Sequence, residues 1–239
     1  MAGQKPFPPQ TTATAMGEGA PKVAAVVLAA GSGVRMGGPK AWMTLGGRSL
    51  AEWCLDALEA ATPEQTVMVV SPAMEDAARA RLGHRCIVDV NTRTDLGKTG
   101  SLQTGLRRLQ DTGHPNMLVV VHPVDHPFVE GATILRLLSA LDIQKGRDLA
   151  VPTHQGRRGH PLILRTQTIP SILRLPASEP LNKWVRSCAE RTLTLEVPDP
   201  AILLNLDTPE QLAEAEQWLD ERGRVVGSLD TTPAPREGS

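Results

Sequence analysis

The sequence contains no tyrosine and only two phenylalanines among its 239 residues, so few aromatic rings are available to stack against unpaired nucleic-acid bases. It also lacks an excess of charge, because 25 basic side chains stand against 26 acidic ones and give a formal net charge of −1. Proteins that bind polyanions normally carry a clear basic excess. These two shortages argue against a nucleic-acid partner.

Cysteine is also scarce, because Cys54, Cys86 and Cys188 lie far apart and no CxxC pair occurs. Such cysteines are expected to be reduced and buried, as in a cytoplasmic protein. No apolar run approaches the length of a membrane span, and the first residues lack the charged-then-apolar pattern of a secretory leader. We therefore expect a cytoplasmic protein with no membrane partner.

The composition divides the chain into three parts. Residues 1–22 are rich in proline, threonine, glycine and alanine and are expected to form a disordered tail, as are residues 224–239. Residues 23–223 have the length of a single domain. Strand and helix patterns alternate within it, which predicts an α/β fold of the Rossmann-like type, with three α/β/α layers and a mostly parallel sheet.

Short apolar runs predict the strands, and capping signals predict where helices begin and end. The strands are expected over residues 23–30, 65–71, 85–90, 117–121, 149–153, 160–164 and 192–197. One helix is expected to start at a capping box, Ser49–Glu52, and to end near Ala61; others are expected over 74–82, 131–141, 167–175 and 182–190. A last helix is expected to begin at Thr208 and stop at Gly223.

The stretch from Val23 to Arg48 organises the rest of the chain. Its apolar run predicts a first strand buried on both faces, and Gly31-Ser32-Gly33 then turns the backbone tightly and exposes its N–H groups. Two cations, Arg35 and Lys40, follow on the same loop. A glycine loop that carries cations after the first strand is typical of a site for an anionic phosphate ligand.

Two other glycine-loop chemistries fit less well. A P-loop needs Gly-Lys-Ser/Thr before a helix, and no such run follows Gly33. A dinucleotide fingerprint needs a helix that starts inside the motif, and here that helix would cross Gly37-Gly38-Pro39. Interior glycines cost roughly 1 kcal/mol each and an interior proline about 3 kcal/mol, so we expect an extended loop to about Gly47.

A second candidate position follows the strongest apolar run, Met117–Val121. Asp125 comes just after it, at the carboxyl end of a central strand, where open α/β sheets bind ligands. A carboxylate that faces a triphosphate needs a divalent cation between them, and Mg²⁺ prefers one or two carboxylates together with phosphate oxygens. The alternative is that Asp125 caps the following helix. His122 and His126 are separated by proline, which prevents a helix, so we expect structural residues or walls of the site.

Two motifs carry a family resemblance: LAAGSGVRMGGPK at Leu28–Lys40 and LGGRSL at Leu45–Leu50. Together they resemble the signature of the nucleotidylyltransferases with a MobA-like fold, and looser similarity extends over about residues 23–222. The resemblance implies a fold like that of the nucleotide-diphospho-sugar transferases. It also implies transfer of a nucleoside monophosphate from an NTP to an acceptor, with release of pyrophosphate.

The resemblance also implies roles for individual residues. Arg35 would contact the β- and γ-phosphates, Lys40 the α-phosphate or the incoming anion, and Asp125 would complete the catalytic set. Asp125 and Asp207 would hold Mg²⁺, or Mn²⁺ in its place. The nucleotide-binding residues would be Leu28, Ala29, Ala30, Gly31, Ser32, Gly33, Thr99, Gly100 and Ser101.

The base and ribose of the nucleotide are expected to lie against the segment after the third strand. Gly97 and Gly100 bracket a predicted loop there, in front of a helix that ends at Leu109. For Thr99 and Ser101 the alternative is a simple helix cap, because a hydroxyl oxygen can accept from the first N–H groups of a helix.

Two further motifs are similar to the family. The segment N-x-D-T-P-E at Asn205–Glu210 corresponds to the family segment that supplies the second metal ligand. Asn205 and Asp207 are expected to share one face of a strand end. A G-x-x-G-H-P hairpin, similar to that of the MocA-like branch, would bring Arg157, Arg158 and His160 to an anionic acceptor. An exposed basic hairpin tip explains these residues equally well.

Ala30 and Gly159–Pro161 favour the cytidylyl branch of the family. This branch implies CTP as the nucleotide and a molybdopterin-type phosphorylated acceptor. A molybdoenzyme is a further candidate partner. The segment Asp95–Ser101 departs from that branch, so a guanylyl, uridylyl or sugar-phosphate system stays open. An alternative of another class is a non-catalytic accessory protein that binds a nucleotide or pterin. Lys40 and Asp125 favour the enzyme, because such a protein would not need them.

Overall fold

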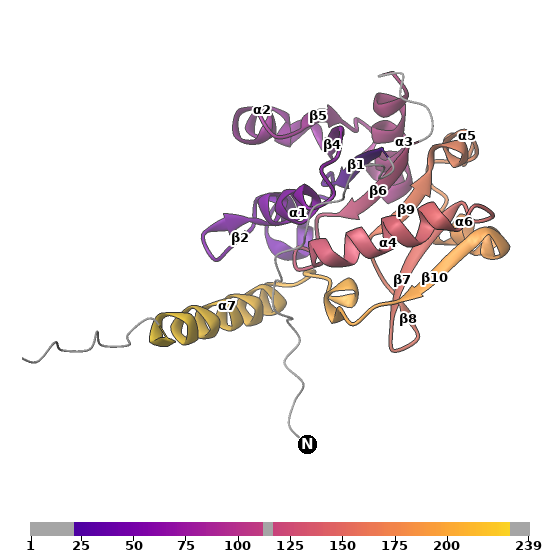
Figure 1. The fold of residues 1–239 in the computed structure, drawn as a ribbon. Helices are drawn as coiled ribbons and strands as arrows, with labels where there is room; N and C mark the ends of the chain where they lie inside the picture. Colours follow the sequence, from indigo (N-terminus) through magenta and orange to yellow (C-terminus); the bar gives the residue numbers. More distant parts are fainter. Residues whose placement is uncertain (1–21, 112–116, 230–239) are drawn as a thin grey trace, which may run out of the picture.

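A sheet of mostly parallel strands lies at the centre of the protein (Figure 1). The computed structural model describes residues 22–111 and 117–229. The strands of the sheet are β1 (Val23–Leu28), β4 (Gln65–Val70), β5 (Ile87–Val90), β6 (Leu118–Pro123), β7 (Leu149–His154), β8 (Arg157–Arg158), β9 (Leu162–Arg165) and β10 (Thr192–Glu196). Their order is β10-β7-β9-β6-β1-β4-β5, β8 pairs with β7, and the antiparallel pairings involve β8 or β9.

Helices cover both faces of this sheet, as the alternating pattern predicted. One face packs against α1 (Leu50–Glu59), α2 (Glu75–Leu82), α4 (Gly131–Ile143) and α7 (Pro209–Leu229), and the other against α3 (Gly97–Gln110), α5 (Ile169–Leu173) and α6 (Leu181–Ser187). The residues of β1 are all buried and alternate between these two cores. The predicted three-layer α/β/α fold is therefore confirmed. The three cysteines are free and buried, also as predicted.

Capping boxes fix the start of two helices at the predicted residues. In front of α1, the Ser49 N–H donates to Glu52 Oε2 at 2.7 Å, and the Glu52 N–H donates back to Ser49 Oγ at 3.3 Å. In front of α7, Thr208 and Gln211 exchange the same pair of hydrogen bonds. Each cap satisfies N–H groups that the first helical turn leaves without partners, which is typically worth about 1 kcal/mol.

The loop after β1 differs from the extended segment that we predicted. It contains two short 3-10 helices, Val34–Met36 and Lys40–Trp42, followed by a small hairpin of β2 (Thr44–Leu45) and β3 (Arg48–Ser49). Backbone hydrogen bonds that close single turns are compatible with its glycines and proline, whereas a full α-helix is not. The structure accordingly has no α-helix between β1 and α1, both of which lie in its described part.

The segment after β5 also differs from the prediction. Helix α3 begins at Gly97, so Thr99, Gly100 and Ser101 lie inside it and form neither a loop nor its cap. The hydroxyl groups of Thr99 and Ser101 instead form hydrogen bonds with other segments. Thr99 Oγ1 donates to the Glu179 carbonyl at 2.6 Å, and Ser101 Oγ accepts from Asn91 Nδ2 at 3.0 Å. Tertiary contacts thus replace the capping bonds that the sequence pattern offered.

Two predictions near the C-terminus are wrong. Residues 200–203 form a 3-10 helix, so Asn205 and Asp207 lie on an irregular segment and not on a strand end; Pro200 provides no N–H for a strand ladder. Helix α7 continues through Gly223 to Leu229, because one interior glycine costs only about 1 kcal/mol and does not by itself end a helix. In Figure 1, α7 projects away from the sheet.

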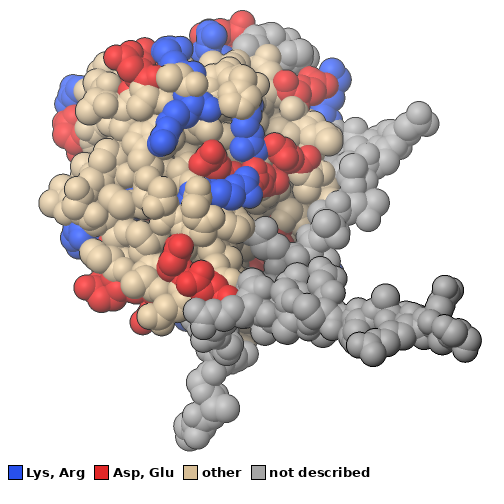
Figure 2. All heavy atoms as spheres, turned by 90° about the vertical axis from the view of Figure 1, so that its left-hand side faces the viewer, with Lys and Arg blue, Asp and Glu red and all other residues tan. Residues whose placement is uncertain are grey.

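The predicted tails lie almost entirely outside the described residues, except for Lys22, which pairs with Glu64 at 2.9 Å, and residues 224–229 of α7. On the face of the molecule shown in Figure 2, basic and acidic side chains lie side by side, as the near-zero net charge suggests. None of the described helices combines the length and the apolarity needed to cross a bilayer.

Candidate active site

The glycine loop after β1 presents unoccupied backbone N–H groups. Gly31 and Ser32 are exposed, and no hydrogen bond within the described residues uses their amides. Gly33 turns the chain with a φ of 59°, and a Cβ there would lie 1.8 Å from the Gly38 carbonyl oxygen. Only glycine fits this turn. The resulting loop is a concavity of N–H groups, which suits an anion.

Lys40 lies where the loop approaches two carboxylates. Its Nζ donates a short hydrogen bond to Asp207 Oδ1 and lies 3.5 Å from Asp125 Oδ2. Arg35, on the same loop, reaches Asp207 Oδ1 at 3.8 Å. Four residues singled out in the sequence therefore meet in one place, although Lys40 and Asp207 are 167 positions apart in the chain.

Asp125 is held at this position by its backbone and by its neighbours. Its carbonyl accepts the Leu206 N–H at 2.9 Å, which ties the end of β6 to the segment that carries the second carboxylate. Its Oδ1 shares a hydrogen bond of 3.0 Å with His126 Nδ1, and its Oδ2 lies 3.2 Å from Lys98 Nζ. Only 7% of the side chain is exposed.

The electrostatic surroundings keep the Asp125 carboxylate ionised. Burial alone would raise its pKa, but the hydrogen bond from His126 and the positive charges of two lysines outweigh this and hold the pKa below its usual range. His122 and His160 are buried, which lowers the pKa of each ring to about 3. These two histidines are therefore neutral at physiological pH, and His160 lines a cavity together with Lys98.

Asp207 is positioned by the start of α7. Its Oδ2 accepts from Asn205 Nδ2 at 2.6 Å, and its backbone N–H donates to Gln211 Oε1 at 2.7 Å. The helix cap itself uses Thr208, so the remaining carboxylate oxygen of Asp207 faces Lys40. The prediction that this carboxylate is not consumed by capping is confirmed.

The donor set fits a divalent metal ion whose coordination is completed by a substrate. One oxygen of Asp125 and one of Asp207 face the same lysine ammonium, so both point to a common volume. Among the described residues, no group of three His, Cys, Asp or Glu side chains could hold a metal ion alone. Mg²⁺ typically takes one or two protein carboxylates and fills its other positions with phosphate oxygens and water.

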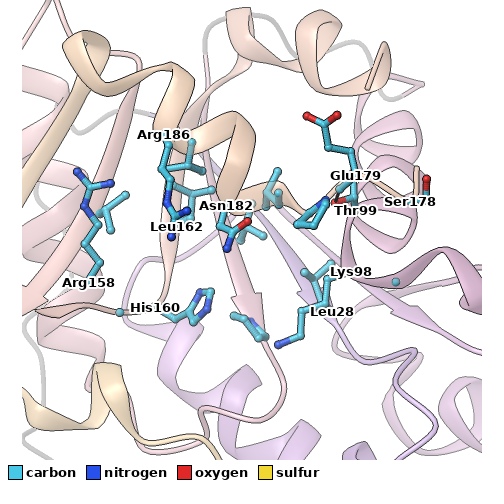
Figure 3. A pocket seen from close by; sticks show the side chains of 18 residues that line it. Leu28, Lys98, Thr99, Arg158, His160, Leu162, Ser178, Glu179, Asn182 and Arg186 are labelled. Carbon is cyan, nitrogen blue, oxygen red and sulfur yellow. Dashed lines mark hydrogen bonds between the residues drawn. The ribbon is translucent and has the colours of Figure 1, made fainter. Parts of the chain in front are cut away.

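A cavity of about 570 Å³ is lined by Lys98, which pairs with Asp125, and by Leu28 at the end of β1. Lys98 lies at one end of it, whereas Arg158 and Arg186 lie toward the other (Figure 3). The apolar part of its lining comes from strand ends and from α6: Leu28, Val121, Val151, Leu162, Leu181 and Val185. The cavity therefore combines apolar walls with cations, which suits an anionic ligand that has an apolar body.

The predicted nucleotide-binding residues are distributed unevenly around the site. Leu28 and Thr99 line the cavity, whereas Ala29 and Ala30 are buried beneath the loop, and Gly100 and Ser101 lie inside α3. The sequence reading missed Lys98 and the contact of His126 with Asp125. A signal for Lys98 was available, because a cation one residue after Gly97 lies in the first turn of α3 and next to the strand ends.

These features define a nucleotidyltransferase. Residues 25–193 match the MobA-like NTP transferase domain, and the chain belongs to this family. The family named in the sequence analysis is therefore confirmed, as is the assignment to the nucleotidyltransferase class of enzymes.

Relatives and solved structures support this assignment. A molybdenum cofactor guanylyltransferase of Cereibacter sphaeroides is 30% identical over 204 residues, which cover 81% of this chain and 95% of that protein. A bifunctional IspD/IspF enzyme of Ruegeria pomeroyi is 35% identical over 125 residues, or 52% of this chain and 32% of that one. The structure of Rv0371c from Mycobacterium tuberculosis, also solved with manganese, is 25% identical, with a TM-score of 0.66 over 87% of this chain and 100% of that chain.

Proposed function

We propose that the protein transfers a nucleoside monophosphate from an NTP to a phosphorylated acceptor of the molybdopterin type and releases pyrophosphate. The observation that carries this proposal is the position of Lys40 between Asp125 and Asp207, beside a loop of unoccupied amides. A separate cavity beside Asp125 provides room for the acceptor. The names of the relatives that match over most of the chain support the molybdenum cofactor as the acceptor class.

The reaction would need positioning and charge compensation more than proton transfer. An oxygen of the acceptor phosphate forms a bond to the α-phosphorus, the bond to the β-phosphate oxygen breaks, and the electron pair leaves with pyrophosphate. The attacking group is already an anion, so no general base is required. The amides of Gly31, Ser32 and Gly33 and the guanidinium of Arg35 would bind the β- and γ-phosphates, and Lys40 would stabilise charge on the α-phosphate.

Asp125 and Asp207 would hold the divalent cation, with Mg²⁺ as the proposed ion and Mn²⁺ as a substitute. When bound, such an ion neutralises phosphate charge and fixes the orientation of the triphosphate. The protein's own contribution is to keep both carboxylates aimed at one volume. The hydrogen bonds from His126 and Asn205 do this by occupying the oxygen of each carboxylate that faces away from Lys40.

For the base, we propose guanine. The CTP preference predicted from Ala30 is not supported by the relatives that match over most of the chain, which are named guanylyltransferases. The structure also removes its physical basis, because Ala30 is only 5% exposed and its methyl group cannot narrow an open slot. CTP remains the competing outcome of the test.

Thermal unfolding in the presence of GTP, CTP, UTP or ATP, each with MgCl₂ or MnCl₂, tests this proposal. A ligand at 100 times its Kd stabilises by about 2.7 kcal/mol, which shifts the Tm of a domain this size by roughly 5–10 °C. We expect the largest shift with GTP, and pyrophosphate release once a molybdopterin acceptor is added. Stabilisation by no NTP, or by NAD alone, would overturn the proposal.

The variant Asp125→Ala separates catalysis from binding and folding. It should release no pyrophosphate while its circular dichroism spectrum matches that of the wild type, because loss of one carboxylate lowers the stability of the domain without unfolding it. Pyrophosphate release at the wild-type rate would remove the metal assignment. Nucleotide binding without turnover by the wild-type protein would favour the accessory-protein alternative.

A further inference from the structure

We propose that Lys98 binds the phosphate of the acceptor and presents it to the nucleotide, so that the large cavity is a site for a phosphate monoester on a flat, apolar-faced body. This inference rests on the proposed function. It adds a residue that the nucleotide loop does not contain and that α3 supplies.

Two lysines from different elements approach the same carboxylate oxygen. Lys40 Nζ lies 3.5 Å from Asp125 Oδ2 and Lys98 Nζ lies 3.2 Å from it. Lys40 is also bound to Asp207 and only 14% of its side chain is exposed, whereas 58% of the Lys98 side chain is exposed. Lys40 is thus fixed on the nucleotide side, and Lys98 is free to move on the cavity side.

Lys98 faces the cavity and has space there. It is the second residue of α3 and lines the cavity together with His160 (Figure 3). A divalent cation held by Asp125 would repel an ammonium from Oδ2, since both carry positive charge. The cavity is the open direction in which Lys98 can then turn. An anionic phosphate located there would receive its charge-assisted hydrogen bond.

The rest of the cavity indicates the shape and chemistry of the ligand. The strand ends supply apolar side chains, such as Val151 and Leu162, against which a flat ring system can pack. Arg158 and Arg186 lie toward the other end, where they can bind carbonyl or further anionic groups of that body. With its phosphate at Lys98, such a ligand points its nucleophilic oxygen at the carboxylate site.

The test uses Lys98→Met, Lys98→Arg and, as a matched control on the exposed turn that follows α4, Lys145→Met. Phenyl phosphate serves as the probe, because it joins a phosphate monoester to a flat apolar ring, and its binding is measured by calorimetry with MnCl₂ and GTP present. We expect Lys98→Met to weaken phenyl phosphate binding about tenfold or more, the size of one lost charge-assisted hydrogen bond. Lys98→Arg should retain part of the affinity, and Lys145→Met all of it.

A second measurement is the affinity for Mn²⁺ without nucleotide, determined by electron paramagnetic resonance. This affinity should change in the direction opposite to that of the affinity for phenyl phosphate. Lys98→Met should bind Mn²⁺ more tightly than the wild type, because the ammonium that competes for Asp125 Oδ2 is gone. Metal binding thus tests the contact between Lys98 and Asp125 independently of phosphate binding. At a Mn²⁺ concentration that saturates every variant, the affinity for GTP should stay within about twofold of the wild-type value in all three variants.

Several outcomes would overturn the role of Lys98 and leave the proposed function standing. These are wild-type affinity of Lys98→Met for phenyl phosphate, no binding of phenyl phosphate to the wild type, or displacement of phenyl phosphate by GTP. Unchanged or weaker Mn²⁺ binding by Lys98→Met would also contradict it. Failure of every NTP to bind the wild-type protein would instead refute the proposed function.

Discussion

Replacing Lys40 with methionine removes the ammonium that separates two carboxylates, and its effect on stability can be worked out from the structure. At 3.5 Å, one ammonium and one carboxylate attract by about 5 kcal/mol if the effective dielectric constant is about 20. Part of this is offset because a methionine needs no desolvation. Removing one partner of a buried ion pair therefore leaves a net loss of about 3–5 kcal/mol.

We expect this loss in the metal-free protein, as a decrease in the free energy of unfolding and a Tm lower by roughly 6–20 °C. Added MnCl₂ should restore more stability in Lys40→Met than in the wild type, because the ion then takes the place between Asp125 and Asp207 without competing with an ammonium. Pyrophosphate release should nevertheless stay far below the wild-type rate, since the charge at the α-phosphate is missing.

Urea unfolding followed by tryptophan fluorescence, once with EDTA and once with MnCl₂, measures this effect. Lys145→Met is the control, because it removes a lysine far from the site and should change neither curve. If Lys40→Met lost the same stability with and without Mn²⁺, the two carboxylates would not share a metal ion. If it lost no stability at all, the ion pair seen in the structure would not contribute to the free energy of unfolding.

Two further predictions concern Asp125 and the hairpin. Burial raises the pKa of Asp125, but its hydrogen bond with His126 and the lysine charges lower the pKa below the unfolded value of about 3.9. The ionised carboxylate therefore stabilises the fold above about pH 3.9. This contribution is lost as the pH falls through the lowered pKa of the folded state. Urea unfolding from pH 7 to pH 3 should therefore show a shallower acid-side decline for Asp125→Asn than for the wild type, with exposed Asp76→Asn as control; parallel curves would contradict this. In Gly159→Ala, the new Cβ would lie 2.4 Å from the Ile202 carbonyl oxygen, which should cost about 1–3 kcal/mol and weaken phenyl phosphate binding by displacing Arg158 and His160. Gly146→Ala, where no atom lies within 4 Å, should leave both stability and binding unchanged, and equal behaviour of the two variants would show that the close approach is unimportant.

Much of the fold could be predicted because local and global signals agree. The apolar run of β1 is buried on both faces, and the Ser49–Glu52 capping box starts α1 where the sequence places it. The exception is the start of α3, where Gly97 and Gly100 were interpreted as the ends of a loop although both lie in the helix. Glycine also serves inside this helix, because a Cβ on Gly105 would lie 2.5 Å from Val26 and prevent close packing on β1. The sequence does not reveal which of these two uses a glycine has.

The site was predictable where a motif names the residue. Lys40, Asp125 and Asp207 belong to such motifs, and the structure brings them together. Lys98 and His126 could not be placed in the same way. Their contacts with Asp125 depend on where α3 begins and on how the His126 ring is turned, and both are set by packing between distant segments.

The main-chain hydrogen bond from Leu206 to Asp125 has a consequence for synthesis and turnover of the protein. A ribosome that has made every strand of the sheet, the last of which ends at Glu196, has not yet made Asp207. The chain made up to that point therefore lacks the second proposed metal ligand. A protease that cut between Glu196 and Asp207 would separate that carboxylate from the chain that carries Asp125 and leave all described strands of the sheet in one piece.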